Sequence, residues 1–177
     1  MRALRASLAA ANPDAGEMAA GWLALARLPR LVGGYRPQGS EIDPGPLMRR
    51  LASAGAALAM PAAIAGDAPL IYRAWRPGDL LVPDAAGVAA PTPAAVLVTP
   101  DLVIAPVLAF DRGGGRLGQG GGHFDRTLAM LRAAGEVWVI GLAFAGQEIA
   151  EVPREPHDQA LDAILTESGY IEVRKDF

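Results

Sequence analysis

The stretch from Phe110 to Leu128 constrains the fold more than any other part of the sequence. It reads FDRGGGRLGQGGGHFDRTL, follows an apolar run, and leads into a helix-like pattern that begins at His123. A strand that ends in a glycine-rich loop and continues into a helix is a typical unit of α/β folds. Because the loop is poor in side chains, its backbone N–H groups beside a helix start favour binding of an anion, most often phosphate.

The rest of the chain alternates between segments typical of helices and of strands. We predict helices at 1–11, from Asp14 to about Leu28, from Asp43 to about Ala54, at 123–134 and at 156–168. We predict strands at 31–35, 56–60, 70–75, 102–110, 137–144 and 170–174, with a wrapping loop at 76–100. This alternation predicts one domain, residues 1–177, of the α/β class, in which helices flank a largely parallel central sheet.

Composition excludes several classes of function. A net charge of −3 argues against a nucleic-acid partner, which requires a basic face. The chain has no cysteine, so disulfides and thiolate chemistry are absent. No apolar run reaches the roughly 18 residues of a membrane span, and the first residues lack the apolar segment of a signal peptide. We therefore expect a cytoplasmic protein without a membrane partner.

The glycine-rich loop matches no common phosphate-binding motif. It lacks the closing Gly-Lys-Ser/Thr of a P-loop, and its single G-x-G-x-x-G spacing, 113–118, is weak evidence in a glycine run. Arg116 has the side chain for a bidentate clamp on phosphate, and Asp125 has the carboxylate for Mg²⁺ beside that phosphate. The alternative is a flexible hairpin in which Asp125 only favours the helix dipole.

The order of residues around the glycines is more specific than the glycines alone. The pattern F-D-x-x-G-x-R-L-G-x-G-x-G, then two ring residues and D-R-x-L, resembles the signature of the 5-formyltetrahydrofolate cyclo-ligases (5,10-methenyltetrahydrofolate synthetases). Other segments resemble the same family: Asp101–Pro106, Ser40–Asp43, Val152-Pro153 with His157-Asp158, and Leu4-Arg5. The resemblance covers about residues 1–170 and is densest from 101 to 160.

The resemblance implies a fold and a reaction. The fold is that of the cyclo-ligases, similar to the NagB, RpiA and CoA-transferase proteins. The reaction is the ATP- and Mg²⁺-dependent closure of 5-formyltetrahydrofolate to 5,10-methenyltetrahydrofolate, which releases ADP and phosphate after phosphorylation of the formyl oxygen. The implied partners are these small molecules alone, and we expect a monomer or a weak homodimer.

Site residues follow from the resemblance, position by position. The implied ATP contacts are Arg2, Arg5, Arg116, Leu117, Gly118, Gln119, Gly120, Gly121, Gly122, His123 and Phe124. The implied folate contacts are Tyr35, Glu41, Gln119, Gly120, Gly121, Gly122 and His123, with Glu41 facing the pterin. Asp125 and Asp158 are the implied Mg²⁺ ligands, and Arg116 and Asp125 the implied catalytic residues. Two structural alternatives stay open: Asp158 as the cap of a helix, and Glu41 as a solvated loop acid.

The sequence departs from the family pattern in three segments. His123-Phe124 stands in place of Tyr-Tyr, Pro106-Val107 in place of Pro-Gly, and Met1 falls where the family's K-x-x-L-R segment has lysine. These departures favour a second hypothesis, a catalytically weakened relative that binds folate or nucleotide. A third hypothesis is another sugar- or acyl-phosphate enzyme on a similar scaffold, because a fold does not fix a function.

Overall fold

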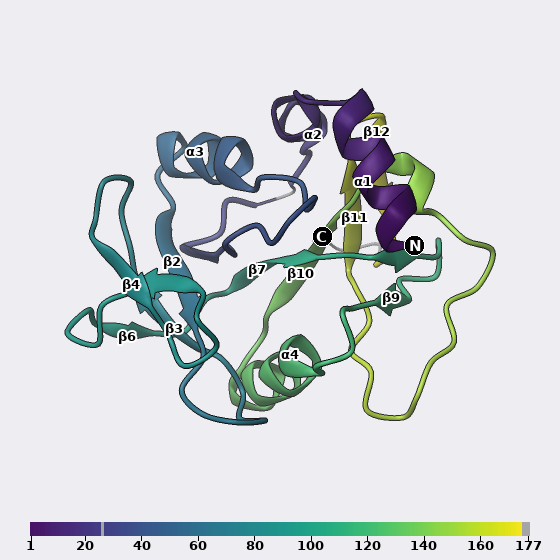
Figure 1. Ribbon diagram of the computed structural model, residues 1–177. Helices are drawn as coiled ribbons and strands as arrows, with labels where there is room; N and C mark the ends of the chain where they lie inside the picture. The colour runs from purple at the N-terminus through teal and green to yellow at the C-terminus, as the bar shows by residue number, and fades with distance from the viewer. Residues whose placement is uncertain (26, 175–177) are drawn as a thin grey trace.

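The computed structural model describes residues 1–25 and 27–174, and a single sheet runs through its centre (Figure 1). The strands of this sheet are β1 (Leu31–Gly33), β2 (Ala57–Ala62), β3 (Ile71–Ala74), β6 (Leu97–Val98), β7 (Leu102–Pro106), β10 (Trp138–Leu142), β11 (Ala163–Thr166) and β12 (Gly169–Glu172). Their spatial order is β12-β11-β10-β7-β1-β2-β3-β6. Two small ribbons lie outside it: β4 (Leu81–Pro83) with β5 (Ala89–Pro91), and β8 (Ala109–Phe110) with β9 (Arg116–Leu117).

The middle of the sheet is parallel and its two ends are antiparallel. Strands β2, β1, β7, β10 and β11 run in one direction, whereas β12 pairs antiparallel with β11, and β3 pairs antiparallel with both β2 and β6. The chain first adds β2 on one side of β1 and later adds β7 on the other side. The strand order therefore reverses between β1 and β7, which is where α/β proteins place their ligands.

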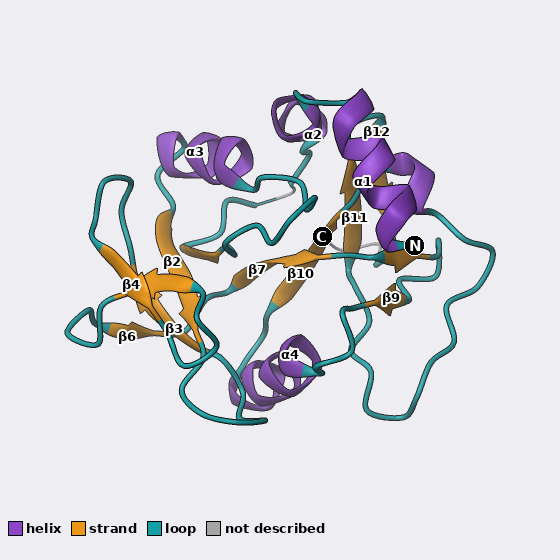
Figure 2. Cartoon of the chain, in the orientation of Figure 1, coloured by secondary structure: helices purple, strands orange, loops and turns teal. Residues whose placement is uncertain are grey.

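Helices cover both faces of the sheet (Figures 1 and 2). Helices α1 (Arg2–Ala11), α2 (Ala15–Trp22) and α3 (Gly45–Ser53) lie on one face, and α4 (His123–Ala134) lies on the other. Successive residues of β7 point to opposite faces, so Ile104 packs in the core with Leu47 of α3, and Val103 packs in the core with Leu128 of α4. This arrangement confirms the predicted α/β class with a largely parallel sheet. Among the described residues, no helix is long and apolar enough to cross a bilayer.

The helix predicted at 156–168 is wrong. Residues 156–162 form turns and irregular chain, and Ala163–Thr166 is the buried strand β11, which pairs in parallel with β10. Asp162 fixes this path, because its carboxylate accepts hydrogen bonds from the Val139 backbone N–H and from Arg132. A strand position beside β10 lets the whole apolar run at 163–165 become buried, which outweighs its local helix propensity.

The other differences concern boundaries. The helix predicted from Asp14 to Leu28 ends at Trp22, and residue 26 of that prediction lies outside the described residues. The segment 76–100 holds three short strands, β4, β5 and β6, where we predicted a loop. The predicted strand 102–110 divides into β7 and β8, with β7 ending at Pro106, where the missing N–H interrupts a sheet ladder. The final strand is β12 at 169–172.

Candidate active site

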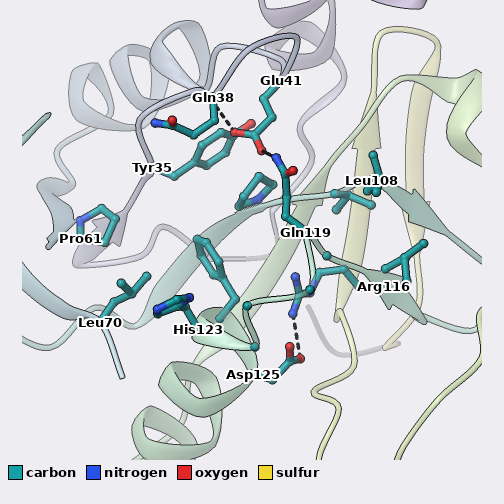
Figure 3. A pocket seen from close by; sticks show the side chains of 18 of the residues that line it. Tyr35, Gln38, Glu41, Pro61, Leu70, Leu108, Arg116, Gln119, His123 and Asp125 are labelled. Atoms are coloured by element: carbon teal, nitrogen blue, oxygen red, sulfur yellow. Dashed lines mark hydrogen bonds and ion pairs between the residues drawn. The ribbon is translucent and has the colours of Figure 1, made fainter. Parts of the chain in front are cut away.

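A cavity of about 770 Å³ lies at the carboxyl ends of β1, β2 and β7, where the strand order reverses (Figure 3). Tyr35 follows β1, Pro61 belongs to the end of β2, and Val107 and Leu108 follow β7. Every residue that the sequence predicted for the site lines this cavity except Arg2. The fold thus brings together the segments around 35–41, 116–125 and 158, which are far apart in the sequence.

One wall of the cavity is the glycine-rich loop, and Asp111 anchors the base of that loop. The buried Asp111 carboxylate accepts hydrogen bonds from the backbone N–H groups of Gly113 at 2.8 Å, Gly115 at 2.9 Å and Val152 at 2.8 Å, and it pairs with Arg154 at 2.8 Å. Burial raises the pKa of this carboxyl, but these donors and the Arg154 charge outweigh burial and lower the pKa below its ordinary value. Asp111 therefore ties the loop to the segment at 152–154.

The tip of the loop adopts a backbone that favours glycine. Gly120 has φ of +97° and Gly122 has φ of +62°, in the left-handed region where a Cβ is strained. Gly122 is also the residue at which α4 begins. Gly118 is not among the glycines of this left-handed region. This wall consists mainly of main chain, so backbone N–H groups near the start of α4 face a potential ligand.

Arg116 and Asp125 form an ion pair in the wall of the cavity. The Arg116 Nη2 atom lies 2.7 Å from Asp125 Oδ1, and the two side chains are 4% and 16% exposed. The guanidinium also lies 5.8 Å from the centroid of the Phe124 ring. The Nε atom of Arg116 is buried and has no hydrogen-bond partner within the described structure. Because a buried N–H without a partner is costly, this atom favours an acceptor supplied by a ligand.

Asp158 lies on the chain segment next to Asp125. The backbone N–H of Gln159 donates to Asp125 Oδ1 at 3.1 Å, so the segment that carries Asp158 contacts the predicted metal ligand directly. Asp158 Oδ2 accepts a hydrogen bond from the backbone N–H of Glu155 at 2.7 Å and closes a turn. The alternative in which Asp158 caps a helix is wrong, because the described residues that follow it, 159–174, contain no helix.

Glu41 lies on the opposite side of the cavity and is fixed by three segments (Figure 3). Its Oε1 accepts hydrogen bonds from Arg5 Nη1 at 3.3 Å and from Gln119 Nε2 at 2.9 Å, and its Oε2 accepts one from the Gln38 backbone N–H at 2.8 Å. Its side chain is only 4% exposed. The alternative of a solvated loop acid is therefore wrong.

Tyr35 supports the same side of the cavity. Its hydroxyl donates to the carbonyl oxygen of Ile42 at 2.6 Å and closes the segment that carries Glu41. Burial raises the pKa of the Tyr35 phenol well above its ordinary value, and the negative charges of Glu41 and Asp43 raise it further. The phenol is thus neutral at physiological pH and acts as a donor that holds the segment in place.

The two predicted arginines of α1 have different surroundings. Arg2 does not line the cavity, and its Nη2 donates to the carbonyl oxygen of Gln119 at 3.3 Å. Arg5 is buried, and its three side-chain nitrogens donate to Ser40, Glu41 and Gln38. The predicted phosphate contacts of both arginines stay predictions.

Several cavity residues were missed by the sequence predictions. Arg154 lines the cavity directly after the Val152-Pro153 segment, and its place inside that motif was a signal that pointed to it. The ring of His123, which the sequence did predict for the site, has its Nε2 atom 3.3 Å from the carbonyl oxygen of Gly66, in the β2–β3 connection. An apolar side wall was also missed, because its residues come from separate loops and strands: Pro61, Ala63, Leu70 and Val88.

Comparison with known proteins shows the family of this chain. The family model of the 5-formyltetrahydrofolate cyclo-ligases matches residues 26–167. The chain belongs to this family. The cyclo-ligase of Mycolicibacterium smegmatis is 35% identical over 164 residues, which cover 87% of this chain and 83% of that protein. The cyclo-ligase of Escherichia coli K12 is 33% identical over 135 residues, which cover 72% of each chain.

Solved structures of cyclo-ligase relatives share the fold. The 5,10-methenyltetrahydrofolate synthetase of Aquifex aeolicus superposes with a TM-score of 0.71 at 24% identity, covering 99% of this chain and 86% of its own. The synthetase of Mycoplasma pneumoniae superposes with a TM-score of 0.67 at 18% identity, covering 94% of this chain and 98% of its own. These likenesses confirm the architecture predicted for a cyclo-ligase.

Proposed function

We propose that this cyclo-ligase family member catalyses the ATP- and Mg²⁺-dependent closure of 5-formyltetrahydrofolate to 5,10-methenyltetrahydrofolate, with release of ADP and phosphate. One observation carries the proposal: a single cavity is lined by the buried carboxylate of Glu41, by the glycine-rich loop, and by the Arg116–Asp125 pair. Glu41 suits the N–H donors of a pterin, and the loop suits phosphate. Each of the two substrates, the folate and ATP, would therefore meet a wall of the cavity that suits its chemistry.

The chemistry needs positioning more than a nucleophilic side chain. The formyl oxygen of the folate is a poor leaving group, and transfer of the γ-phosphoryl group from ATP to that oxygen makes it a good one. The second folate nitrogen then attacks the activated carbon and loses its proton, and the C–O bond breaks to release phosphate. Phosphoryl transfer depends on orientation and on neutralisation of charge. We expect the cavity to provide both, and the described residues that line it include no cysteine or lysine.

The residues of the loop wall would act on the phosphates. Backbone N–H groups around Gly120 and Gly122 would hold phosphate oxygens at the start of α4. Arg116, whose Nε lacks a partner, would bind the transferred group and offset its charge. Because Asp125 holds the other end of this guanidinium, the clamp is oriented before the substrate arrives.

The carboxylates of Asp125 and Asp158 fit a magnesium ion that arrives with ATP. Among the described residues, no cluster of three or more acidic, histidine or cysteine side chains could hold a metal ion by itself. Mg²⁺ is usually held by one or two carboxylates together with substrate phosphates, so these two cavity residues suffice. When bound, the ion would neutralise charge on the β- and γ-phosphates.

A second candidate function rests on the ring residues before Asp125. His123 and Phe124 replace the Tyr-Tyr of the family pattern, and His123 contacts the β2–β3 connection instead of presenting a phenol. This difference favours a relative that binds folate and nucleotide with weakened turnover. The two functions share the cavity and differ in the rate of the chemical step.

The rise of methenyl-folate absorbance tests the proposal. Purified, folded protein with 5-formyltetrahydrofolate, ATP and Mg²⁺ should produce methenyl product well above a control without enzyme, and a chelator should abolish the signal. Calorimetric titration of each substrate distinguishes the second function, which predicts binding without product. Absence of both product and folate binding would overturn the two functions together.

A further inference from the structure

Arg126 lies in the first turn of α4 and contacts the peptide bond between Gly121 and Gly122. Its Nη2 atom donates to the carbonyl oxygen of Gly121 at 2.7 Å. A Cβ added at Gly122 would lie 2.7 Å from Arg126 Nη1, so the guanidinium occupies space that only a glycine leaves there. Gly121 and Gly122 line the cavity, whereas Arg126 does not. The guanidinium therefore packs against the tip of the loop from outside the cavity.

This contact fixes the direction of one backbone N–H group. The described chain contains no cis peptide bond. In a trans peptide, the carbonyl oxygen and the following N–H point in opposite directions. Because the carbonyl of Gly121 is directed at Arg126, the N–H of Gly122 points away from Arg126. Within the part of the chain that the structure describes, this N–H has no hydrogen-bond partner, so it remains available to a ligand at the start of α4.

We infer that Arg126 is a positioning residue for ATP, which holds the Gly121–Gly122 peptide so that the N–H of Gly122 is directed at a phosphate oxygen. The inference rests on the proposed function and assigns a role in it to a residue outside the cavity. A peptide between two glycines rotates easily, because neither residue has a Cβ to restrict it. A contact that fixes this peptide before the ligand arrives reduces the ordering cost of binding.

Two other features of Arg126 define what the experiment must separate. Its Nη2 atom lies 3.9 Å from Asp67 Oδ1, but the Asp67 side chain is 97% exposed, so this pair contributes little to the position of the guanidinium. Its Nε atom is buried without a partner in the described structure. A direct contact of Arg126 with phosphate is therefore the competing role, and it differs from positioning in one respect: it leaves the ligand-free loop unchanged.

The experiment combines two measurements on the wild type and Arg126→Met. Calorimetric titrations give the Kd of ATP with Mg²⁺ and the Kd of 5-formyltetrahydrofolate. Amide NMR spectra of protein labelled with ¹⁵N-glycine follow the resonance of Gly122 without ligand and with ATP, and Gly78, a glycine outside the cavity, serves as the internal reference. If Arg126→Met does not fold, as judged by its thermal melt, Arg126→Gln, with a shorter side chain, takes its place.

Two control variants accompany the measurements. Asp67→Asn removes the exposed carboxylate near Arg126 and keeps the contact with Gly121. Arg49→Met removes an exposed arginine that pairs with Glu17 on the surface, outside the cavity. Neither substitution should change either Kd by more than twofold.

The expected result is selective for ATP and visible before ATP is added. Arg126→Met should raise the Kd of ATP at least fivefold and change the Kd of 5-formyltetrahydrofolate by less than twofold. In the ligand-free spectrum of this variant, the Gly122 resonance should move from its wild-type position, and the Gly78 resonance should stay in place. Addition of ATP to the wild type should shift the Gly122 amide proton, because that N–H then donates to phosphate.

Three results would overturn the inference: an unchanged Kd of ATP in Arg126→Met, equal effects on both ligands, or a weaker ATP affinity with an unmoved Gly122 resonance in the ligand-free protein. The third result would assign Arg126 a direct phosphate contact. A wild-type protein that binds no ATP is a different outcome, because it would overturn the proposed function itself. The two failures are distinguishable, since the first three results all require a wild type that binds ATP.

Discussion

The two walls of the cavity are built by opposite means. The glycine-rich wall presents main chain, and its backbone at Gly120 and Gly122 has positive φ angles. The Glu41 wall presents a side chain held by Arg5, Gln119 and a backbone N–H, with Tyr35 closing the segment behind it. A backbone wall suits phosphate, which every nucleotide carries, whereas an oriented carboxylate suits the particular donors of one ring.

We expect this difference to separate the two walls in function, with the chemical step at one and selection of the folate at the other. Substitutions in the loop wall should affect the nucleotide and the chemical step, and substitutions in the Glu41 wall should affect the folate. Gln119 is the residue that joins them, because it belongs to the loop and donates to Glu41. Four experiments test whether the two walls have separate functions.

The largest effect is expected at Asp125. Asp125→Ala removes the carboxylate that orients Arg116 and that would hold Mg²⁺, so kcat/KM should fall roughly 10³-fold, about 4 kcal/mol. The melting temperature should also fall, because the buried guanidinium of Arg116 loses its carboxylate, so kinetics are measured where the variant is folded. Asp79→Ala, at an exposed turn outside the cavity, is the control. An unfolded Asp125→Ala variant would show that this residue is structural.

Glu41→Gln should affect the other substrate. Loss of the charge should weaken folate binding by about 2–3 kcal/mol, the range of a hydrogen bond to a charged group, and leave the KM of ATP nearly unchanged. Steady-state kinetics with each substrate varied in turn give this split. Equal increases of both KM values would mean that the two walls are not separate in function.

The anchor of the loop wall should respond to acid. The Asp111 carboxyl has a lowered pKa in the folded protein, so its contribution to stability is fully present above the unfolded pKa of about 3.9 and is lost as pH falls through the lower folded value. Asp111→Asn should cost about 2 kcal/mol at neutral pH and less in acid. Urea unfolding at several pH values below 5 measures this dependence.

A second carboxylate offers the control for Asp111. Burial raises the pKa of Asp101, but its hydrogen bonds from the backbone N–H groups of Leu31 and Arg30 outweigh burial and lower it. Asp101 does not line the cavity. Asp101→Asn should therefore flatten the acid dependence of stability and leave turnover intact, whereas Asp111→Asn should also slow turnover. Equal turnover in both variants would contradict the anchoring role.

The smallest effect is expected at the tip of the loop. Gly120→Ala forces a Cβ onto a residue with φ of +97°, at a cost of about 1–2 kcal/mol, although the added atom meets nothing within 4 Å. Gly78 has the same φ and the same open surroundings outside the cavity. Both substitutions should lower the melting temperature equally, and only Gly120→Ala should raise the KM of ATP. Unequal destabilisation would show that the two turns are not equivalent.

The sequence predicted what depends on local pattern. Helix α4 was predicted with its bounds because Gly122 and Gly135 flank it, and the site residues were identified because their motif is local and dense. Strand β11 was missed because its apolar run lies between two strands, the neighbouring β12 and the parallel β10, and the pairing with β10 is not revealed by local pattern. Among the short strands between 76 and 100, β6 pairs with β3, whereas β4 and β5 pair only with each other, over three residues each.

The contacts within the site could not be predicted from the motif. The Arg5–Glu41 pair joins residues that match separate segments of the family pattern, and nothing in either segment indicates that they meet. The four donors around Asp111 likewise come from two loops. The sequence predicted the residues of the site, and the structure was needed to show which of them contact one another.

The order of the strands also affects when the cavity can form during synthesis of the chain. Strand β1 finds its neighbour β7 only about 70 residues later in the chain, at the register of Val32 with Leu102. At roughly 5–20 residues per second on the ribosome, the segment that carries Tyr35 and Glu41 waits about 4–14 s before the other side of the cavity exists. We therefore expect nascent chains to acquire folate affinity only after the glycine-rich loop has emerged.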